Sequence, residues 1–564
     1  MLQQTKLCIA AVAGILSHCL VFIRNEHHIQ APQLFRFFLL LSLFLFIGEA
    51  RLWALSDSGQ AAKTSALIVL SYAASLFTSI AVYRAFFHKL RKFPGPTGAR
   101  VSKFWHVGKL LGRPNFKVLD ELHQQYGDFV RTGEPFPPAR NQQSSSHRKL
   151  LGPNEISIRS PSAMAEINGP GSRCTKAPFY DLLLPRTSII TTRNKTLHDQ
   201  RRRIWDYGFG AKALNQYEPQ VDHYASLLTS AISQRLGAPM DVTSWFHYFS
   251  FDLMGQLSFG KSFNMLATGE RHFAIDLMRD GLTLLGLFTP TPWLARIGFS
   301  IPGVASGWKS MFVWSDAQMR ERIDREDDGE NNDITSWLIN ASRENNSLEA
   351  DRSWLNGDAF GIIIAGSDTT ATTLAMLFYH LALDPCQISK IRAELVQLDA
   401  KPDARALQTL PHLNGAINET LRLHPPVPSN GLRESPPDGI TIASTFIPGS
   451  TVLCLPVYSL HRLASCFERP LEFIPERWYS KPELVHDKGA FAPFNQGRFG
   501  CVGKNLALME VRAVTAALLN RYDLEFAPGM GKGEGVERDM GDQFTATPGK
   551  LELVFSERVR KGEV

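Results

Sequence analysis

The chain has 564 residues, of which 44% are hydrophobic and 20% charged, and its formal net charge is +6 at pH 7. These proportions exclude an intrinsically disordered chain, and the basic excess is too small and diffuse to indicate nucleic-acid binding. The seven cysteines form no CxxC pair and have no regular spacing, so they predict neither a disulfide framework nor a zinc site of cysteines.

Three apolar stretches open the chain, over residues 7–23, 37–55 and 66–87. Each is close to the roughly 20 residues that cross a ~30 Å hydrocarbon layer, although Glu49 and Arg51 weaken the second. A cleaved signal peptide would explain only the first stretch, which lacks a small-residue cleavage site, and buried core helices are the other alternative. We predict that residues 1–92 are a membrane anchor of one to three transmembrane helices.

The end of the third stretch is basic, with Arg84, Lys89, Arg91 and Lys92. Lysine and arginine collect on the cytosolic side of membrane proteins, so the large body that follows is predicted to face the cytosol. Pro94 and Pro96 come next. Because proline cannot continue a helix, they predict a stiff hinge between anchor and body.

Periodic apolar stretches dominate the body, for example over residues 360–383, 413–423 and 506–519, and they predict helices. Short alternating pieces over residues 440–442 and 451–455 predict strands. Residues 324–333 are acidic and polar, which predicts a solvated loop. The expected fold class is therefore mainly α with a small β component.

His198 and Arg202 belong to a basic run over residues 198–203. They lie one helical turn apart, so both side chains can face one carboxylate. A solvated helix face or a partner-binding patch is the alternative interpretation of such an arginine run.

The stretch over residues 360–383 contains Asp368 among threonines. It is long enough to span a membrane, but Asp368 and the hydroxyl groups around it would be costly in lipid. We therefore expect a helix of the body. The neighbouring Gly366 and hydroxyl pair can loosen that helix locally.

Glu419 and Arg422 are spaced by three residues, which places them on one face of a helix. Taken alone, such a pair is usually a surface ion pair worth well under ~1 kcal/mol. A second arginine, Arg477, follows in the segment Pro475-Glu476-Arg477-Trp478.

A glycine-rich loop over residues 491–503 turns into an apolar helix and contains Cys501. Loop glycines let the backbone approach a bound group, and the N-terminal dipole of the helix favours a negative thiolate. A single cysteine in such a loop is more often a packing residue. The other motifs of the chain decide between these interpretations.

The loop resembles the FxxGxxxCxG haem-binding signature of the cytochrome P-450 family, and Phe494, Gly497, Cys501 and Gly503 match it. The Glu419–Arg422 pair, residues 475–478, residues 365–370 and residues 198–203 resemble further motifs of the family in the family's order. The resemblance covers about residues 93–564 and implies a cytochrome P-450 fold with a haem-thiolate monooxygenase domain. Filamentous-fungal enzymes of secondary metabolism are the most similar, tryprostatin hydroxylases among them.

The resemblance implies a role for each matched residue. Cys501 would bind the iron of haem b. Thr369 would hydrogen-bond dioxygen while Asp368 relays protons, and Glu419, Arg422 and Arg477 would form a buried structural cluster. The haem propionates would be bound by His198, Arg202 and Arg433.

Two departures from the family stand out. The family usually has arginine two residues before the cysteine, where this chain has Phe499, with Arg498 one place earlier. Residues 134–151 read like an insertion between two pieces that relatives join as a hairpin. We expect a disordered surface loop there and hypothesise a translated intron, which a transcript that uniformly encodes the segment would refute.

The implied function is hydroxylation or oxidation of a hydrophobic small molecule with O2 and with electrons from NADPH. An NADPH-cytochrome reductase, a flavoprotein, would dock near Arg498 and Lys504. Membrane lipid would hold the anchor, and the implied localisation is the endoplasmic reticulum membrane with the catalytic domain facing the cytosol. Family analogy places the substrate pocket at residues 179–192 and at Phe360, Ile364, Val427, Ser429 and Thr545. Alternatives are a haem-thiolate isomerase or dehydratase and a non-catalytic membrane haem-binding protein.

Overall fold

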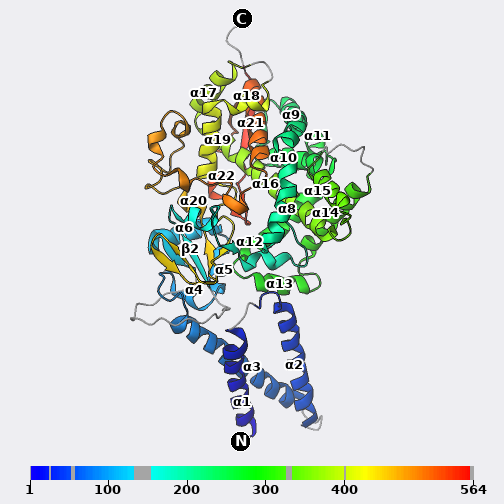
Figure 1. Ribbon diagram of the computed structural model, residues 1–564, viewed down its shortest axis with the longest axis vertical. Helices are drawn as coiled ribbons and strands as arrows, with labels where there is room; N and C mark the ends of the chain where they lie inside the picture. Colours follow the sequence, from blue (N-terminus) through cyan, green and yellow to red (C-terminus); the bar gives the residue numbers. More distant parts are fainter. Residues whose placement is uncertain are drawn as a thin grey trace.

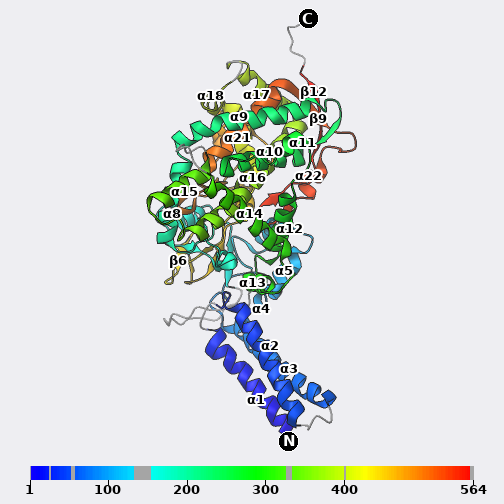
Figure 2. The ribbon, with the colours of Figure 1, turned by 90° about the vertical axis from the view of Figure 1, so that its right-hand side faces the viewer.

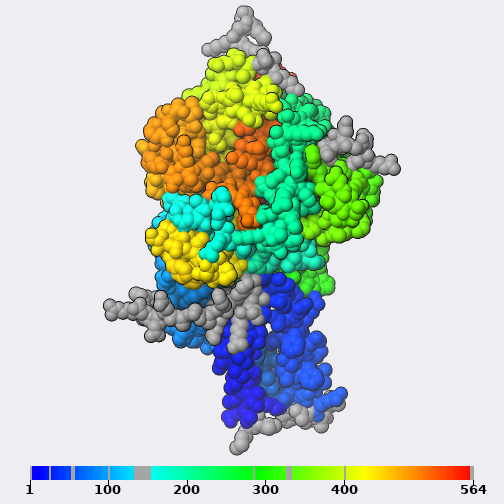
Figure 3. Space-filling model, viewed as in Figure 1, coloured from blue at the N-terminus to red at the C-terminus, as the bar shows by residue number. Residues whose placement is uncertain are grey.

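The computed structural model of the protein describes residues 2–23, 27–52, 58–132, 154–325, 333–398 and 402–558. Three N-terminal helices project from one end of a larger, mainly helical body (Figure 1). The space-filling view shows the same division, with the narrow anchor below the wide body (Figure 3). The expected insertion at residues 134–151 lies outside the described residues and stays a prediction.

The anchor consists of α1 (Leu2–Ser17), α2 (Ala31–Leu52) and α3 (Ser58–Val82), with π-helical turns that prolong α1 to Phe22 and α3 to Phe87. By length and composition, the segments Gln3–Phe22, Ala31–Arg51 and Ser58–Phe87 can each cross a membrane. Glu49, which weakened the second stretch in sequence, pairs with Lys6 of α1 at 2.6 Å. If these helices cross a membrane, this pairing would offset part of the cost of a carboxylate in lipid.

The junction between anchor and body is packed. Pro96 is extended, and the Pro94 carbonyl accepts a hydrogen bond from the Arg131 N–H at 2.8 Å. Phe93 is buried in a cluster of the body's apolar side chains. On the other side, the His28 Nε2 atom lies 2.8 Å from Asp181 of the body, and α2 contacts α13 (Pro292–Ser300). The proline segment is therefore held at its body end.

The helical part of the body surrounds α16 (Arg352–Leu383), which packs most extensively on α10 (Val242–Phe259) (Figure 2). Although α16 is long and apolar enough to span a membrane, 78% of its apolar window is buried inside the body. The membrane alternative for this segment is thereby excluded. The helix begins eight residues before the predicted start at residue 360.

The other longer helices pack around this pair. They are α6 (Asn115–Tyr126), α8 (Lys195–Gly208), α9 (Ala211–Ser233), α12 (Phe273–Phe288), α14 (Ser306–Asp324), α15 (Ile334–Glu344), α17 (Pro385–Leu395), α19 (Pro411–Leu423) and α21 (Lys504–Arg521). Shorter ones are α4 (Thr97–Val101), α5 (Phe104–Leu110), α7 (Ala163–Asn168), α11 (Met265–Thr268), α18 (Ala404–Gln408), α20 (Val457–Leu460) and α22 (Glu534–Arg538). The predicted helices at residues 413–423 and 506–519 are confirmed.

The largest sheet has the strand order β1-β2-β8-β5-β3. Its strands are β1 (Phe129–Arg131), β2 (Glu155–Ile158), β3 (Thr175–Lys176), β5 (Arg433–Glu434) and β8 (Val452–Cys454). β1 and β2 pair antiparallel, as expected for a hairpin on either side of the predicted insertion. In the short β3–β5 pair, Lys176 lies opposite Arg433.

Three small sheets complete the β component. β4 (Pro239–Asp241), β9 (Tyr522–Phe526) and β12 (Glu552–Glu557) form one, β6 (Ile440–Ile442) with β7 (Thr445–Ile447) the second, and β10 (Gly541–Asp542) with β11 (Ala546–Thr547) the third. The strands predicted at residues 440–442 and 451–455 are confirmed, the second as the shorter β8.

The predicted solvated loop over residues 324–333 needs correction at its ends. Asp324 ends α14, and Asp333 is buried, caps α15 through the Ser336 N–H at 2.7 Å and pairs with Arg322 at 2.7 Å. The acidic composition concealed this cap, because an N-terminal aspartate that accepts backbone N–H groups can be buried at little cost.

Candidate active site

A cavity of about 330 Å³ lies in the body between α16, α21, α8 and the β3–β5 pair. Seven of the residues predicted from sequence line it: His198, Arg202, Thr369, Arg433, Phe494, Cys501 and Gly503. They come from segments up to 300 residues apart in the chain, and one cavity brings them together. Gly497 and Asp368 lie behind the wall.

The loop before α21 holds Cys501 in the cavity wall. The Cys501 N–H donates to the Phe494 carbonyl at 2.8 Å, which closes the loop on itself. Gly497 has a φ of +64°, and a Cβ atom there would lie 2.0 Å from the Asn168 carbonyl oxygen. Only glycine fits this position without moving α7, so Gly497 shapes the loop.

The Cys501 thiol lies in a mixed electrostatic environment. Burial raises its pKa, whereas the backbone N–H groups of Gly503 and Lys504, together with the charges of Arg202 and Lys504, lower it. The exposed surface of Cys501 is surface of the cavity that it lines. Burial is the largest influence, and the net pKa of the thiol is raised. The N–H donors and cations would stabilise the thiolate once the sulfur binds a metal.

One side of the cavity is basic. Lys176 and Arg433, opposite each other on β3 and β5, are both buried and both line the cavity. Lys176 donates to the Ile189 carbonyl at 2.6 Å, and Arg433 donates to the Asn168 side chain at 2.8 Å. Burial first, and the charge of Arg433 second, hold the pKa of Lys176 well below its usual range. Sequence reasoning missed Lys176.

The basic run at the start of α8 divides among three faces of the helix. Arg202 lines the cavity and donates to the Gly500 carbonyl at 2.7 Å. Arg201 is buried and pairs with Asp358 of α16 at 2.7 Å, whereas Arg203 is exposed. His198 lines the cavity, and burial first, with Lys176 next, lowers its pKa to about 4. The predicted His198–Arg202 pair thus shares one face.

Phe499 occupies the centre of this basic region. Its ring lies 5.1 Å from the Lys176 Nζ atom, 4.7 Å from the Arg433 guanidinium and 4.9 Å from the centroid of the His198 ring. Arg498 instead pairs with Asp199 near the surface. An aromatic face attracts cations, so Phe499 helps to hold the basic side chains that surround it.

On α16, Thr369 and Asp368 point to different sides. Thr369 lines the cavity, and its hydroxyl donates to the Ala365 carbonyl at 2.8 Å. Asp368 is buried behind it, with its Oδ1 atom 4.0 Å from Nδ1 of His247 on α10. The structure therefore brings the hydroxyl to the cavity and places the carboxyl next to a histidine that sequence reasoning missed.

Sequence reasoning also missed an acidic residue of the cavity wall. Glu510 of α21 is buried, lines the cavity and hydrogen-bonds the Thr370 side chain. Burial raises its pKa to about 8, so it is largely protonated at neutral pH. Among the residues that the structure describes, it is the one acidic residue of the cavity wall. An acid inside the apolar stretch at residues 506–519 was the available signal.

Glu419, Arg422 and Arg477 meet away from the cavity. Glu419 accepts two hydrogen bonds of 2.9 Å from Arg422 and one of 2.8 Å from Arg477, and all three side chains are fully buried. Trp478 donates to the same carboxylate at 2.9 Å. The remaining guanidinium N–H groups reach backbone carbonyls, for example that of His461 at 2.9 Å.

The rest of the cavity wall is mainly apolar. Of the predicted pocket positions, Val427 lines it, as do Tyr180, Ile189 and Ile190 from residues 179–192. Four predictions are wrong by one residue: Phe360, Ile364, Ser429 and Thr545 lie outside the wall, where Gly361, Ala365, Asn430 and Phe544 are found. Phe360 packs instead against Phe312, with ring centroids 4.9 Å apart, because one step along a helix turns a side chain by about 100°.

Comparison with known proteins shows the family of the chain. The cytochrome P-450 family model matches residues 158–555. A cytochrome P-450 monooxygenase of Aspergillus versicolor is 37% identical over 98% of this chain and 97% of its own length. Tryprostatin B 6-hydroxylase of Neosartorya fischeri is 37% identical over 93% of both chains. The crystal structure of a cytochrome P-450 haem domain, 19% identical, covers 79% of this chain and 93% of its own with a TM-score of 0.65, which shows a shared fold.

Proposed function

The chain belongs to the cytochrome P-450 family, and on that premise we propose that Cys501 is the axial ligand of its iron. Enzymes of this family use haem b with a thiolate ligand, and the fungal relatives are monooxygenases of secondary metabolism. The protein is accordingly a haem-thiolate monooxygenase of secondary metabolite biosynthesis. The position of Cys501, at the cavity and at the start of α21 with two N–H groups on its sulfur, carries the assignment.

The cavity wall fits haem b. Haem b has two propionate carboxylates, and the wall offers four basic side chains, namely Lys176, His198, Arg202 and Arg433, of which the buried Lys176 and Arg433 have no carboxylate partner among the described residues. Taking a cation out of water is costly unless an anion pairs with it, so Lys176 and Arg433 would hold the propionates, with His198 and Arg202 beside them. When bound, the haem supplies an iron that activates dioxygen, and the thiolate favours O–O cleavage.

Replacement of Cys501 by alanine tests the ligand. Loss of the sulfur should abolish the thiolate-type carbon monoxide difference spectrum of the reduced protein, because no other cysteine lines the cavity among the described residues. Cys386→Ala, which removes an exposed cysteine, should leave the spectrum unchanged and serves as the control. A thiolate-type spectrum in Cys501→Ala would refute the assignment.

We propose that Thr369 and Asp368 act in proton delivery to the reacting oxygen. Thr369 places a hydroxyl in the cavity, and Asp368 holds a carboxyl one residue away, beside His247. A positioned donor of this kind is worth about 10²–10⁴ in rate. Thr369→Ala should uncouple NADPH consumption from product and divert electrons to hydrogen peroxide, whereas Thr369→Ser should remain coupled. Equal coupling in the two variants would remove this role.

The proposed substrate is a hydrophobic small molecule. The apolar wall, which includes Ile190, Met254, Val427 and Phe544, would exclude water and bind it by apolar contact. Phe544 stacks on Phe179 with ring centroids 5.5 Å apart, so the two loops that carry them fix this side of the wall together. Metabolite profiling of a host that expresses the protein with a reductase would identify the compound that is consumed.

The proposed electron donor is an NADPH-cytochrome reductase that docks on the cysteine-loop side. Lys504 is exposed there and adds positive charge next to the ligand loop, and Arg498 of the same loop is exposed and pairs with Asp199. Lys504→Glu should raise the KM for reductase, and Lys532→Glu, at an exposed site on the C-terminal loop, should not. An unchanged KM in Lys504→Glu would move the docking surface elsewhere.

We also propose that the anchor lies in the endoplasmic reticulum membrane with the body in the cytosol. The three helices are long enough to span a bilayer, and basic residues such as Lys89 and Arg91 gather at their body end. Protease added to intact microsomes should then digest the body. A protected body would reverse the orientation.

A further inference from the structure

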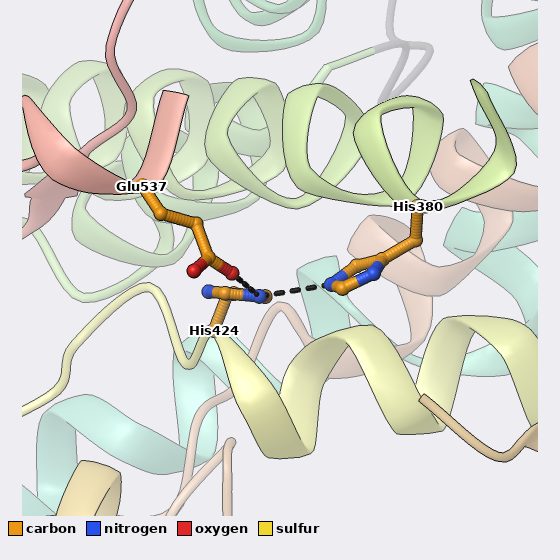
Figure 4. Close-up of side chains that lie close together, drawn as sticks. All are labelled: His380, His424 and Glu537. Carbon is orange, nitrogen blue, oxygen red and sulfur yellow. Dashed lines mark hydrogen bonds and ion pairs between the residues drawn. The ribbon is translucent and has the colours of Figure 1, made fainter. Parts of the chain in front are cut away.

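Two histidines and a glutamate meet at the C-terminal end of α16. His380 lies in the last turn of α16, His424 directly follows α19, and Glu537 lies in α22, as Figure 4 shows. The Nε2 atoms of the histidines are 2.9 Å apart, and the His424 Nε2 atom is 3.1 Å from the Glu537 carboxylate. None of the three lines the cavity.

Ordinary hydrogen bonds cannot satisfy this arrangement. An imidazole nitrogen has a single in-plane direction, in which it carries either one proton or one lone pair. The His424 Nε2 atom nevertheless has two partners, His380 and Glu537. Its other nitrogen, Nδ1, is buried without a hydrogen-bond partner among the described residues. One of the two contacts at Nε2 therefore lacks a proton.

A cation between the three side chains would satisfy all of them at once. Their ligand atoms lie within 4.8 Å of one another, and both histidines are buried, while the Glu537 side chain is 48% exposed. The glutamate thus leaves a path for an ion to enter and room for a water ligand. The nearby cations have partners of their own, since Arg422 pairs with Glu419 and Arg462 lies 3.6 Å over the Tyr458 ring.

We propose that His380, His424 and Glu537 bind a divalent first-row transition-metal ion, with zinc as the best match. Two imidazole nitrogens and one carboxylate oxygen, with a fourth position open to water, are a donor set typical of zinc. The two contacts of the His424 Nε2 atom, 2.9 and 3.1 Å long, would have to open by about a few tenths of an ångström to accept an ion at the usual ~2.0–2.2 Å from each ligand atom.

The ion would link three segments that are distant in sequence. α22 leads within six residues to Phe544, which reaches the cavity wall. The proposed site therefore fixes one end of the loop that carries Phe544 to the ends of α16 and α19. It would act on substrate binding through this loop, and it is independent of the haem ligand.

Zinc binding to the purified full-length, haem-loaded protein tests the proposal. After treatment with a chelator and dialysis, the protein should bind added Zn²⁺ stoichiometrically in a calorimetric titration and unfold at a higher temperature. Glu537→Gln and His380→Gln should each weaken binding by about tenfold or more. His486→Gln is the matched control, because His486 and Glu468 form a histidine–glutamate pair on the surface, 3.7 Å apart.

The thiolate-type carbon monoxide spectrum establishes that each variant is folded, and it does not depend on the proposed site. The proposal is overturned if the parent protein binds no zinc beyond that of a variant lacking both Glu537 and His380 side chains. It is also overturned if Glu537→Gln binds zinc as tightly as His486→Gln does. Since Glu537 is half-exposed, its replacement keeps the fold and the test remains decisive.

Discussion

Two groups of buried charges in this body differ in one respect. In the cluster of Glu419, Arg422 and Arg477, a carboxylate lies between two guanidinium groups, and the remaining N–H groups reach backbone carbonyls. In the basic wall of the cavity, Arg202 pairs with Asp206 at 2.7 Å and His198 contacts Asp199 at 3.3 Å. The buried amine of Lys176 and the buried guanidinium of Arg433 instead donate to a backbone and an amide oxygen, with no carboxylate partner among the described residues. One group is complete without a ligand, and the other is not.

The difference separates structural from functional residues. Charges that neutralise one another inside the protein need no ligand, and removing one of them leaves its partner buried at a high cost. Charges that lack a counterion are costly to bury, and they are retained where a ligand supplies that counterion. By this criterion the first group belongs to the fold, and the second belongs to the cofactor site.

The largest effect is expected from breaking the complete cluster. Glu419→Gln leaves Arg422 and Arg477 buried without a carboxylate, which should cost about 3–5 kcal/mol of the free energy of unfolding. Denaturant unfolding of the haem-loaded protein measures it. Glu472→Gln, in an exposed pair with Arg469, is the control and should not shift the midpoint. Equal midpoints for the two variants would show that the cluster is dispensable.

A smaller effect of opposite sign is expected in the basic wall. Lys176→Met removes a buried basic side chain, so the haem-free protein should become more stable. The haem-loaded protein should lose haem about tenfold faster, as expected for the loss of one charged hydrogen bond. Transfer of haem to excess apomyoglobin measures the loss. Arg203→Met removes an exposed cation from the same region and should change neither quantity. Slower or unchanged haem loss in Lys176→Met would contradict the propionate role.

The smallest effect concerns pH. His198 has a pKa of about 4 in the folded protein against an ordinary 6.5, so between these values the unfolded chain binds a proton that the folded chain does not. The haem-free protein should therefore lose stability as pH falls from 6.5 towards 4, and His198→Gln should lose less. Unfolding midpoints at a series of pH values measure this, and identical slopes would contradict the assignment. Bound haem should flatten the parent's slope, because propionates favour the charged imidazole.

The sequence predicts the complete cluster better than the basic wall. Spacing by three residues places Glu419 and Arg422 on one face of α19, but Arg477 lies 55 residues beyond Arg422 and came only from family resemblance. Lys176 belongs to a two-residue strand without a motif, and only its pairing with β5 brings it beside Arg433. Long-range strand pairing of this kind leaves no local signal.

The helices were predictable because apolar residues recur at helical spacing over long stretches. The side chains that face the cavity were predictable only in part. The stretch at residues 360–383 indicated α16, yet periodicity does not show which side of the helix faces the cavity. Family analogy placed the pocket at Phe360 and Ile364, each one residue away from the cavity wall. His247, the partner of Asp368, lies on α10, and no local sequence pattern in α10 or α16 indicates that the two side chains meet.

The packed junction below the body determines where the chain can be cut. Leu90 and Phe93 are buried with Ile156 and Leu453 of the large sheet, so a soluble enzyme that starts at the prolines would lack part of its own core. A version that starts before Lys89, whose amine contacts the Gly449 carbonyl, keeps that core intact. Detergent-free preparation of this enzyme therefore depends on retaining a few residues that sequence alone assigns to the membrane.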